Sequence, residues 1–281
     1  MLHPLFTMIE NLFAGKIRSP LLAEHEIESP LMGRAMKFST LSPPPGVEGE
    51  AGLVLLFHGM GNDHRALDKY GLSRILAEGM AEGRIPPNHF VTPNGERGFY
   101  VNWRDESRPY EDHIVEEVLP AAERILGLEP DRGRRHLLGV SMGGLGAVQV
   151  GLRHPDLFFA ITALSAPVMN EKQAVDHVRN SSFARWFVDF ERIFGELEDD
   201  EFMRTHNPFA ILKSRPIEDV NQRIFLATGD REREFFLETS RAFHRFLDER
   251  GIEHHWEEYP GKHGWRYWSP VIERALAWAA G

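Results

Sequence analysis

Cysteine is absent from the 281-residue sequence. Disulfide bonds, thiolate nucleophiles, zinc sites built on cysteine and iron–sulfur clusters are therefore excluded. A chain without thiols suits a reducing compartment, so we expect a cytoplasmic protein. Residues 1–20 also lack the basic start, the unbroken apolar run and the small-residue cleavage site of a secretory signal.

Long apolar runs and basic clusters are missing as well. No stretch approaches the roughly 18 consecutive apolar residues that indicate a membrane-spanning helix, so we expect no membrane span. The formal net charge is -10, and no run of Lys and Arg breaks the acidic composition. Because nucleic acids are bound through clustered basic side chains, we do not expect one as a partner.

An amphipathic pattern is present at the start of the chain. Apolar residues recur at helical spacing from Leu2 to Phe13, and Gly15 follows, which predicts a short helix within residues 1–20. Its polar face lacks the Lys and Arg that would favour a membrane surface. We therefore expect this helix to pack on its own subunit or on a second copy in a homo-oligomer.

Segments typical of strands and of helices alternate along the rest of the chain. Continuous apolar runs such as GLVLLFHG are typical of strands buried on both faces of a mostly parallel sheet. We predict strands at residues 33–42, 52–59, 89–95, 134–140, 158–166, 223–229 and 252–261, the first at an edge, and helices at 63–80, 110–127, 143–155, 233–251 and 269–280. The alternation predicts a single α/β domain over residues 1–281, with helices on both faces of one sheet.

The stretch from about 167 to 222 breaks this alternation, because it is helical and acidic in FARWFVDFERIFGELEDDEF. We predict that it forms a helical excursion over the carboxyl edge of the sheet. Ligands bind at that edge in open α/β folds.

One serine stands between glycines at the end of a predicted strand. Ser141 lies in GVSMG, a G-x-S-x-G pattern with Gly139 and Gly143, and a small-residue helix follows. A serine on so sharp a strand-to-helix turn takes strained backbone angles, and side chains two positions away would collide. The helix also points its positive end at a developing oxyanion. We therefore predict that Ser141 is a nucleophile.

A nucleophilic serine needs a base, and the base needs an acid that orients it. His263 is the best-placed base, because its loop YPGKHGWRYW joins the last predicted strand to the last predicted helix. The acid is expected in the loop after the preceding strand, where Asp230, Glu232 and Glu234 are all candidates.

An oxyanion hole combines the backbone amide after the nucleophile with an amide from the loop after an earlier strand. Met142 provides the first amide, and Met60 in FHGMGN is the best second donor.

Two groups of histidines could be interpreted as metal sites: His58 with Asp63 and His64, or His254 with His255 and His263. The glycines between His58 and Asp63 suit a turn better than a metal site. We therefore predict no metal and no organic cofactor.

Several other side chains are candidates for contact with a substrate. Four aromatic residues either line a substrate pocket or belong to the core: Trp103, Trp265, Tyr267 and Trp268. Three polar residues are candidates to face a substrate: Asn102, Glu111 and Asp112. For the two acids, the alternative is a solvated helix surface.

Taken together, the motifs resemble the serine esterase family that includes esterase D (S-formylglutathione hydrolase), the feruloyl and acetyl-xylan esterases and the antigen 85 mycolyltransferases. The resemblance runs from about residue 30 to the C-terminus. It rests on LFHGMG, YVNW with the later YED, GVSMGGLGA, RHPDLFFAITALSA, NPF and YPGKHGWRYW. It implies the α/β-hydrolase fold in a single domain.

The resemblance also implies roles for individual residues. The family's nucleophile falls on Ser141, its histidine on His263, and its two oxyanion amides on Met60 and Met142. Its acid usually stands three residues after the glycine that ends the strand. Counting from the glycine of RIFLATG gives Glu232, where the family more often has aspartate, and the loop here is a residue or two longer.

We therefore predict a serine carboxylesterase that hydrolyses small soluble carboxylic esters or thioesters through an acyl-enzyme on Ser141. An acyltransferase with the same triad and an alcohol or sugar acceptor is the first alternative, and only product analysis separates the two. A non-catalytic binding protein that retains the fold is the second. The presence of both Ser141 and His263 argues against it.

Overall fold

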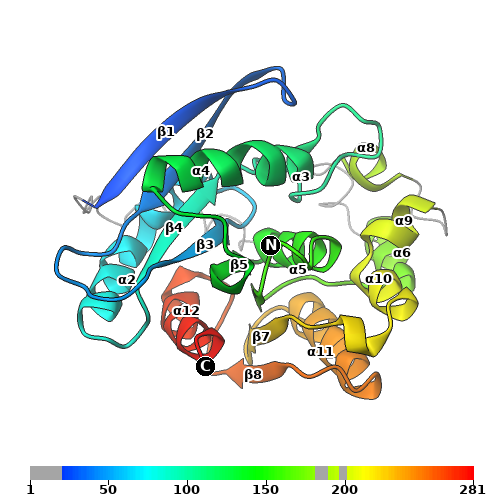
Figure 1. The fold of residues 1–281 in the computed structure, drawn as a ribbon. Helices are drawn as coiled ribbons and strands as arrows, with labels where there is room; N and C mark the ends of the chain where they lie inside the picture. The colour runs from blue at the N-terminus through cyan, green and yellow to red at the C-terminus, as the bar shows by residue number, and fades with distance from the viewer. Residues whose placement is uncertain (1–20, 181–188, 196–200) are drawn as a thin grey trace.

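A computed structural model describes residues 21–180, 189–195 and 201–281 (Figure 1). The helix predicted within residues 1–20 lies outside the described residues. So do two parts of the predicted excursion, residues 181–188 and 196–200.

One eight-stranded sheet forms the centre of the molecule, in the order β1-β2-β4-β3-β5-β6-β7-β8. The strands are β1 (Leu22–Ser29), β2 (Arg34–Leu41), β3 (Gly52–Phe57), β4 (Asn88–Pro93), β5 (Arg135–Val140), β6 (Ala160–Leu164), β7 (Arg223–Gly229) and β8 (His255–Tyr259). β2 pairs antiparallel with both β1 and β4, and every other neighbouring pair is parallel. This arrangement confirms the predicted α/β class.

Helices cover both faces of the sheet (Figure 1). They are α2 (Leu72–Ala81), α3 (Tyr110–Asp112), η3 (His113–Val118), α4 (Leu119–Leu126), η4 (Arg132–Arg134), α5 (Met142–Arg153), α6 (Glu171–Asn180), α8 (Phe190–Phe194), α9 (Glu201–His206), α10 (Pro208–Ser214), η5 (Ile217–Asp219), α11 (Glu234–Glu249) and α12 (Trp265–Ala279). Strand β3 shows how the faces divide. Leu53, Leu55 and Phe57 pack in the core with α4, α5, α10 and α11, whereas Val54 and Leu56 pack with α2 and α12. β3 is thus buried on both faces, as its apolar run predicts.

The edge of the sheet differs from the prediction. The predicted edge strand, now β2, lies inside the sheet, and β1 is the edge strand, paired with β2 along its whole length. The sequence of β1, LAEHEIES, has no apolar run and carries three glutamates, which are exposed on one face of the strand. A charged edge strand lacks the buried-strand pattern that identified the others.

The helix predicted from residue 63 begins later. Two short turns, η1 (His64–Leu67) and η2 (Lys69–Gly71), precede α2. Gly71 adopts a left-handed conformation with φ 68°, which separates these turns from the regular helix.

The described part of residues 167–222 contains α6, α8, α9 and α10, which lie together at one end of the molecule (Figure 1). α8 contacts the loop that follows β4, where the amide of Arg104 donates to the carbonyl of Ile193 at 3.0 Å. This segment therefore reaches the carboxyl edge of the sheet. No helix in the described ranges is long and apolar enough to cross a membrane.

Glu111 faces neither a substrate nor solvent. Its side chain is 1% exposed, and its Oε1 accepts from Arg153 Nε at 2.7 Å and lies 2.8 Å from His154 Nε2. These partners stand at the end of α5, so the carboxylate ties α3 to α5. Asn102 Oδ1 accepts from the amide of Asp112 at 3.1 Å, which ties the loop after β4 to the last residue of α3.

Replacing Glu111 with alanine is expected to lower the free energy of unfolding by about 3 kcal/mol, because Arg153 loses its carboxylate partner and keeps only the carbonyl of Thr205. Burial raises the pKa of Glu111, but His154 and Arg153 outweigh burial and lower it below its ordinary value of 4.5. The stabilisation is therefore fully present above pH 4.5 and is lost as the pH falls through the lowered pKa of the folded state. Urea unfolding measures the change. Asp112→Ala is the control, and an equal midpoint for both variants contradicts the prediction.

Candidate active site

Four loops meet at the carboxyl edge of the parallel strands. They follow β3, β5, β7 and β8 and carry Met60, Ser141, Glu232 and His263, respectively. Because parallel strands end at the same edge, residues far apart in the sequence become neighbours.

Ser141 occupies the sharp turn between β5 and α5. Its backbone has φ 56° and ψ -121°, a strained conformation for a residue with a side chain. A Cβ added to Gly139 would lie 1.9 Å from the carbonyl oxygen of Gly143, and one added to Gly143 would lie 2.1 Å from the carbonyl oxygen of Phe57. The turn that presents Ser141 is therefore possible only with glycine on both sides.

His263 bridges the serine and a carboxylate. Its Nε2 lies 2.9 Å from Ser141 Oγ, and its Nδ1 lies 2.9 Å from Glu232 Oε2. With Nδ1 protonated, the ring donates to the carboxylate and Nε2 accepts from the serine hydroxyl. Phe236 stacks on the ring at 4.1 Å between centroids, and Trp268 meets it edge-on at 4.8 Å. Aromatic packing therefore restricts the orientation of the imidazole.

Of the three candidate acids, the structure brings Glu232 to His263. The Glu232 side chain has no exposed surface. Asp230 is exposed, and its Oδ1 accepts from the amide of Gly261 at 2.9 Å. Glu234 is exposed at the first residue of α11.

Ser165 is a part of this network that the sequence reasoning missed. Its hydroxyl donates to Glu232 Oε1 and accepts from Trp268 Nε1 at 2.8 Å. Glu232 Oε1 also accepts from the amide of Gly229 at 3.2 Å. Ser165 directly follows β6 with φ 51°, at the same sheet edge as Ser141. A polar residue at the end of a buried apolar strand is the signal that could have identified it.

The loop after β3 lies against Ser141. A Cβ added to Gly59 would lie 3.4 Å from Ser141 Cβ. The loop is fixed by His58, whose Nδ1 lies 3.0 Å from the carbonyl oxygen of Gly59 and whose Nε2 lies 3.1 Å from the amide of Gly95. The Tyr100 hydroxyl donates a hydrogen bond to the carbonyl of His58 at 3.0 Å. Burial lowers the pKa of His58 to about 4, so its ring is neutral at pH 7.

The two predicted oxyanion donors are the backbone amides of Met142 and Met60. Met142 is the first residue of α5 and Met60 belongs to the loop after β3. Within the described ranges neither backbone amide donates to another protein group. Both are thus free to bind an oxygen atom of a substrate.

Neither of the two suggested metal sites is assembled as a group among the described residues. Both ring nitrogens of His58 face backbone groups, and Asp63 binds Arg65. Among the described residues, one group of side chains is close enough to share a metal ion: His244, Asp248 and His254, whose ligand atoms lie within 4.8 Å of one another. Neither His255 nor His263 belongs to that group.

The four aromatic candidates divide between core and cavity. Trp265 and Trp268 are buried, and Tyr267 packs against the core on the α12 face. Trp103 is half-buried and lines a cavity.

A family model and two relatives match the sequence. The Esterase family model, described as "Putative esterase", matches residues 29–279. The acetyl esterase of Caldicellulosiruptor saccharolyticus is 25% identical over 187 residues, which is 66% of this chain and 69% of the relative. Esterase Rv1288 of Mycobacterium tuberculosis is 28% identical over 233 residues, 76% of this chain. That match spans 49%, about half, of the mycobacterial protein.

Solved structures share the fold. A ferulic acid esterase superposes with a TM-score of 0.74 at 21% identity, over 92% of this chain and 97% of its own. FphF, a fluorophosphonate-binding serine hydrolase of Staphylococcus aureus, has a TM-score of 0.76 at 22% identity, over 92% and 98%. S-formylglutathione hydrolase (FrmB) of the same organism has a TM-score of 0.72 at 22% identity, over 92% and 99%. The predicted α/β-hydrolase fold is confirmed.

Proposed function

The chain belongs to the esterase family and is a carboxylic ester hydrolase, and we propose that it hydrolyses small carboxylic esters or thioesters through an acyl-enzyme on Ser141. One observation carries this proposal: the hydrogen-bonded series Ser141–His263–Glu232, in which both contacts measure 2.9 Å. The buried carboxylate holds the imidazole in the tautomer that accepts a proton at Nε2.

In the proposed first step, Ser141 Oγ attacks the carbonyl carbon of the ester while His263 Nε2 takes the hydroxyl proton. The negative charge that develops on the carbonyl oxygen is stabilised by the amides of Met60 and Met142. Glu232 stabilises the imidazolium that forms. His263 then donates its proton to the departing alcohol or thiol, which leaves an acyl group on Ser141.

In the second step, water takes the place of the leaving group. His263 removes a proton from this water as the oxygen attacks the acyl carbonyl, and the same two amides stabilise the second oxyanion. Return of the proton to Ser141 Oγ releases the acid. Ser165 acts as a positioning residue, because its hydroxyl holds the Glu232 oxygen that does not face His263.

The scope of the substrate follows from similarity and composition. Named relatives and neighbours include an acetyl esterase, a ferulic acid esterase and an S-formylglutathione hydrolase, which supports small acyl esters and thioesters as substrates.

The composition supports the proposed compartment and partners. A chain without cysteine and with a net charge of -10 supports a cytoplasmic enzyme that does not bind nucleic acid. The N-terminal apolar pattern supports a homo-oligomer.

Labelling with a fluorescent fluorophosphonate tests the nucleophile directly. The native protein is expected to react within minutes at one site, because the reagent phosphonylates serines whose hydroxyl is activated by a base. Mass spectrometry of the tryptic peptides is expected to map the label to Ser141, and heat-denatured protein is the control. Absence of labelling, or labelling at another residue, contradicts the proposal.

Product analysis separates hydrolysis from acyl transfer. The enzyme is incubated with 4-nitrophenyl acetate and an added acceptor alcohol, and the acyl products are quantified. Acetate is expected to be the main product. If the ester of the acceptor predominates, the same catalytic residues serve an acyltransferase.

A further inference from the structure

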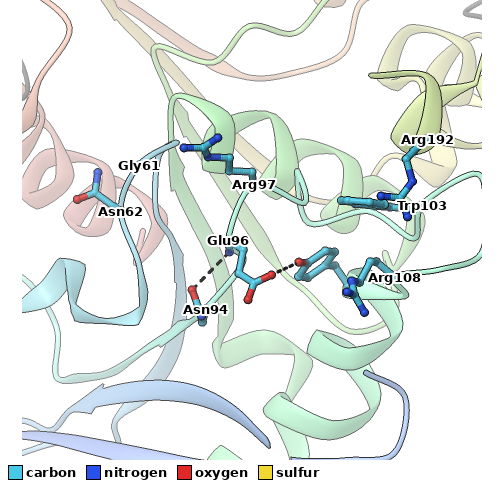
Figure 2. A pocket seen from close by; sticks show the side chains of 9 residues that line it. Gly61, Asn62, Asn94, Glu96, Arg97, Trp103, Arg108 and Arg192 are labelled. Atoms are coloured by element: carbon cyan, nitrogen blue, oxygen red, sulfur yellow. Dashed lines mark hydrogen bonds between the residues drawn. The ribbon is translucent and has the colours of Figure 1, made fainter. Parts of the chain in front are cut away.

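A cavity of about 480 Å³ opens among residues that follow strands β3 and β4 (Figure 2). Its lining residues are Gly61, Asn62, Asn94, Glu96, Arg97, Trp103, Arg108, Tyr110 and Arg192. Gly61 stands two residues after Gly59, the residue that lies against Ser141. The cavity is thus built by the loops after β3 and β4, at the same sheet edge as the nucleophile, and α8 contributes Arg192.

Two of the charged residues in this cavity already have partners. Arg192 Nε lies 2.8 Å from Asp105 Oδ2, and its guanidinium lies 4.9 Å from the centre of the Trp103 ring. Glu96 lies 2.8 Å from Arg34 and accepts from the Tyr110 hydroxyl. Burial raises the pKa of Glu96, but Tyr110 and Arg34 outweigh burial and lower it. The charges of Arg192 and Glu96 are therefore both balanced locally.

Two other arginines have no such partner. In the described part of the chain, the side chains of Arg97 and Arg108 form no hydrogen bond and no ion pair with another residue. Arg108 is half-buried, so its charge is partly removed from solvent, and it also lowers the pKa of Glu96 through space. In Figure 2, Arg97 extends toward the Gly61 end of the cavity, whereas Arg108 lies on the side of Trp103.

The loop that carries these arginines has a strained but well-held backbone. Four of its residues other than glycine have positive φ: Glu96 at 47°, Phe99 at 56°, Tyr100 at 61° and Glu106 at 59°. Tyr100 is fully buried, and the amide of Trp103 donates to the carbonyl of Arg108 at 3.0 Å. Strain of this kind persists where the surrounding structure fixes the backbone, and it is common at ligand sites.

We propose that this cavity binds an anionic group of the substrate, a carboxylate or a phosphate, through Arg97 and Arg108. A guanidinium group presents paired N–H donors that match both oxyanions. Neither guanidinium is held by a hydrogen bond to a described residue of the protein, so the exposed Arg97 and the half-buried Arg108 both have N–H donors available for an anionic substrate group. This inference rests on the proposed function, because it specifies which esters the same site prefers.

Three matched pairs of esters test the preference. The first pair is 4-acetoxybenzoate and its methyl ester, with the anion on the leaving group. The second is 4-acetoxyphenyl phosphate and its dimethyl ester, and the third is the mono-4-nitrophenyl ester of adipic acid and its methyl ester, with the anion on the acyl group. Each kcat/KM is divided by the rate of uncatalysed hydrolysis, which removes differences in intrinsic reactivity.

We expect the wild type to favour the anionic member of at least one pair by about tenfold, and the double variant Arg97→Gln/Arg108→Gln to reduce that ratio to about one. Arg124→Gln is the control for the general effect of losing an arginine, since it removes one positive charge from the exposed surface of α4, outside the cavity. A preference in the first pair alone indicates a carboxylate, and a preference in the second pair alone indicates a phosphate. No preference in any pair, or an equal loss in Arg124→Gln, overturns the inference.

A binding measurement separates failure of this inference from failure of the proposed function. Isothermal titration of the Ser141→Ala protein with 4-acetoxybenzoate needs no turnover. Binding that is about tenfold weaker after the two arginine substitutions supports the anion site even if no ester is hydrolysed. Hydrolysis of neutral esters without any anion-dependent binding supports the proposed function and refutes the anion site.

Discussion

The Ser141→Ala variant is expected to hydrolyse 4-nitrophenyl acetate at least about 10⁴-fold more slowly than the wild type, measured as kcat. The variant keeps His263 and the two proposed oxyanion donors but has no side-chain oxygen to form the acyl-enzyme. Removing a nucleophile of this type leaves a residual acceleration of about 10³ over water, which comes from the oxyanion hole and from substrate binding. The decrease is therefore large without being complete.

A second substitution makes this test more specific. Residues that act as a unit in catalysis are not additive, so the double variant Ser141→Ala/His263→Ala is expected to be no slower than Ser141→Ala, within about threefold. Circular dichroism of both proteins checks that the fold is retained. Substantial activity in Ser141→Ala, or a further large loss in the double variant, contradicts the assignment of Ser141 and His263 to one catalytic unit.

Glu232→Gln is expected to lower kcat by about 10³- to 10⁴-fold, although the side chain keeps its size. The amide NH₂ of glutamine donates to His263 Nδ1, whereas the carboxylate accepts from it at 2.9 Å. The proton then stays on Nε2, which can no longer accept the hydroxyl proton of Ser141. The substitution therefore acts through the tautomer of the histidine, and the same measurement of kcat detects it.

The neighbouring acids provide matched controls. Glu234→Gln makes the same chemical change two residues away at an exposed position, and we expect kcat to stay within about twofold of the wild type. Asp230→Asn tests the remaining candidate acid. If Asp230→Asn or Glu234→Gln abolishes turnover while Glu232→Gln retains it, the assignment of the acid is wrong.

Local features of this chain were predictable because their causes are local. The turn at Ser141 needs glycine on both sides for steric reasons that involve only residues near in sequence and one adjacent strand. The buried strands were also identified, since burial on both faces demands a continuous apolar run. β1 was missed for the converse reason, because a solvent-exposed edge strand tolerates glutamate.

Side-chain contacts between distant elements could not be predicted in the same way. Asp230, Glu232 and Glu234 follow the same strand within a few residues, and their order alone does not reveal which side chain faces the end of β8. Only the spacing implied by the family resemblance favoured Glu232. The contact of Ser165 with Glu232 and the ion pair of Glu111 with Arg153 also join residues from separate elements.

The chain order of strand, glycine turn and helix therefore predicted the fold, which is confirmed, and led to the proposal of Ser141 as nucleophile and His263 as base. Only the tertiary structure brings Glu232 to His263, brings Ser165 to Glu232, and places Arg97 and Arg108 in the lining of one cavity. The physical reason is that backbone sterics act over a few residues, whereas the pairing of side chains depends on where the ends of distant strands meet.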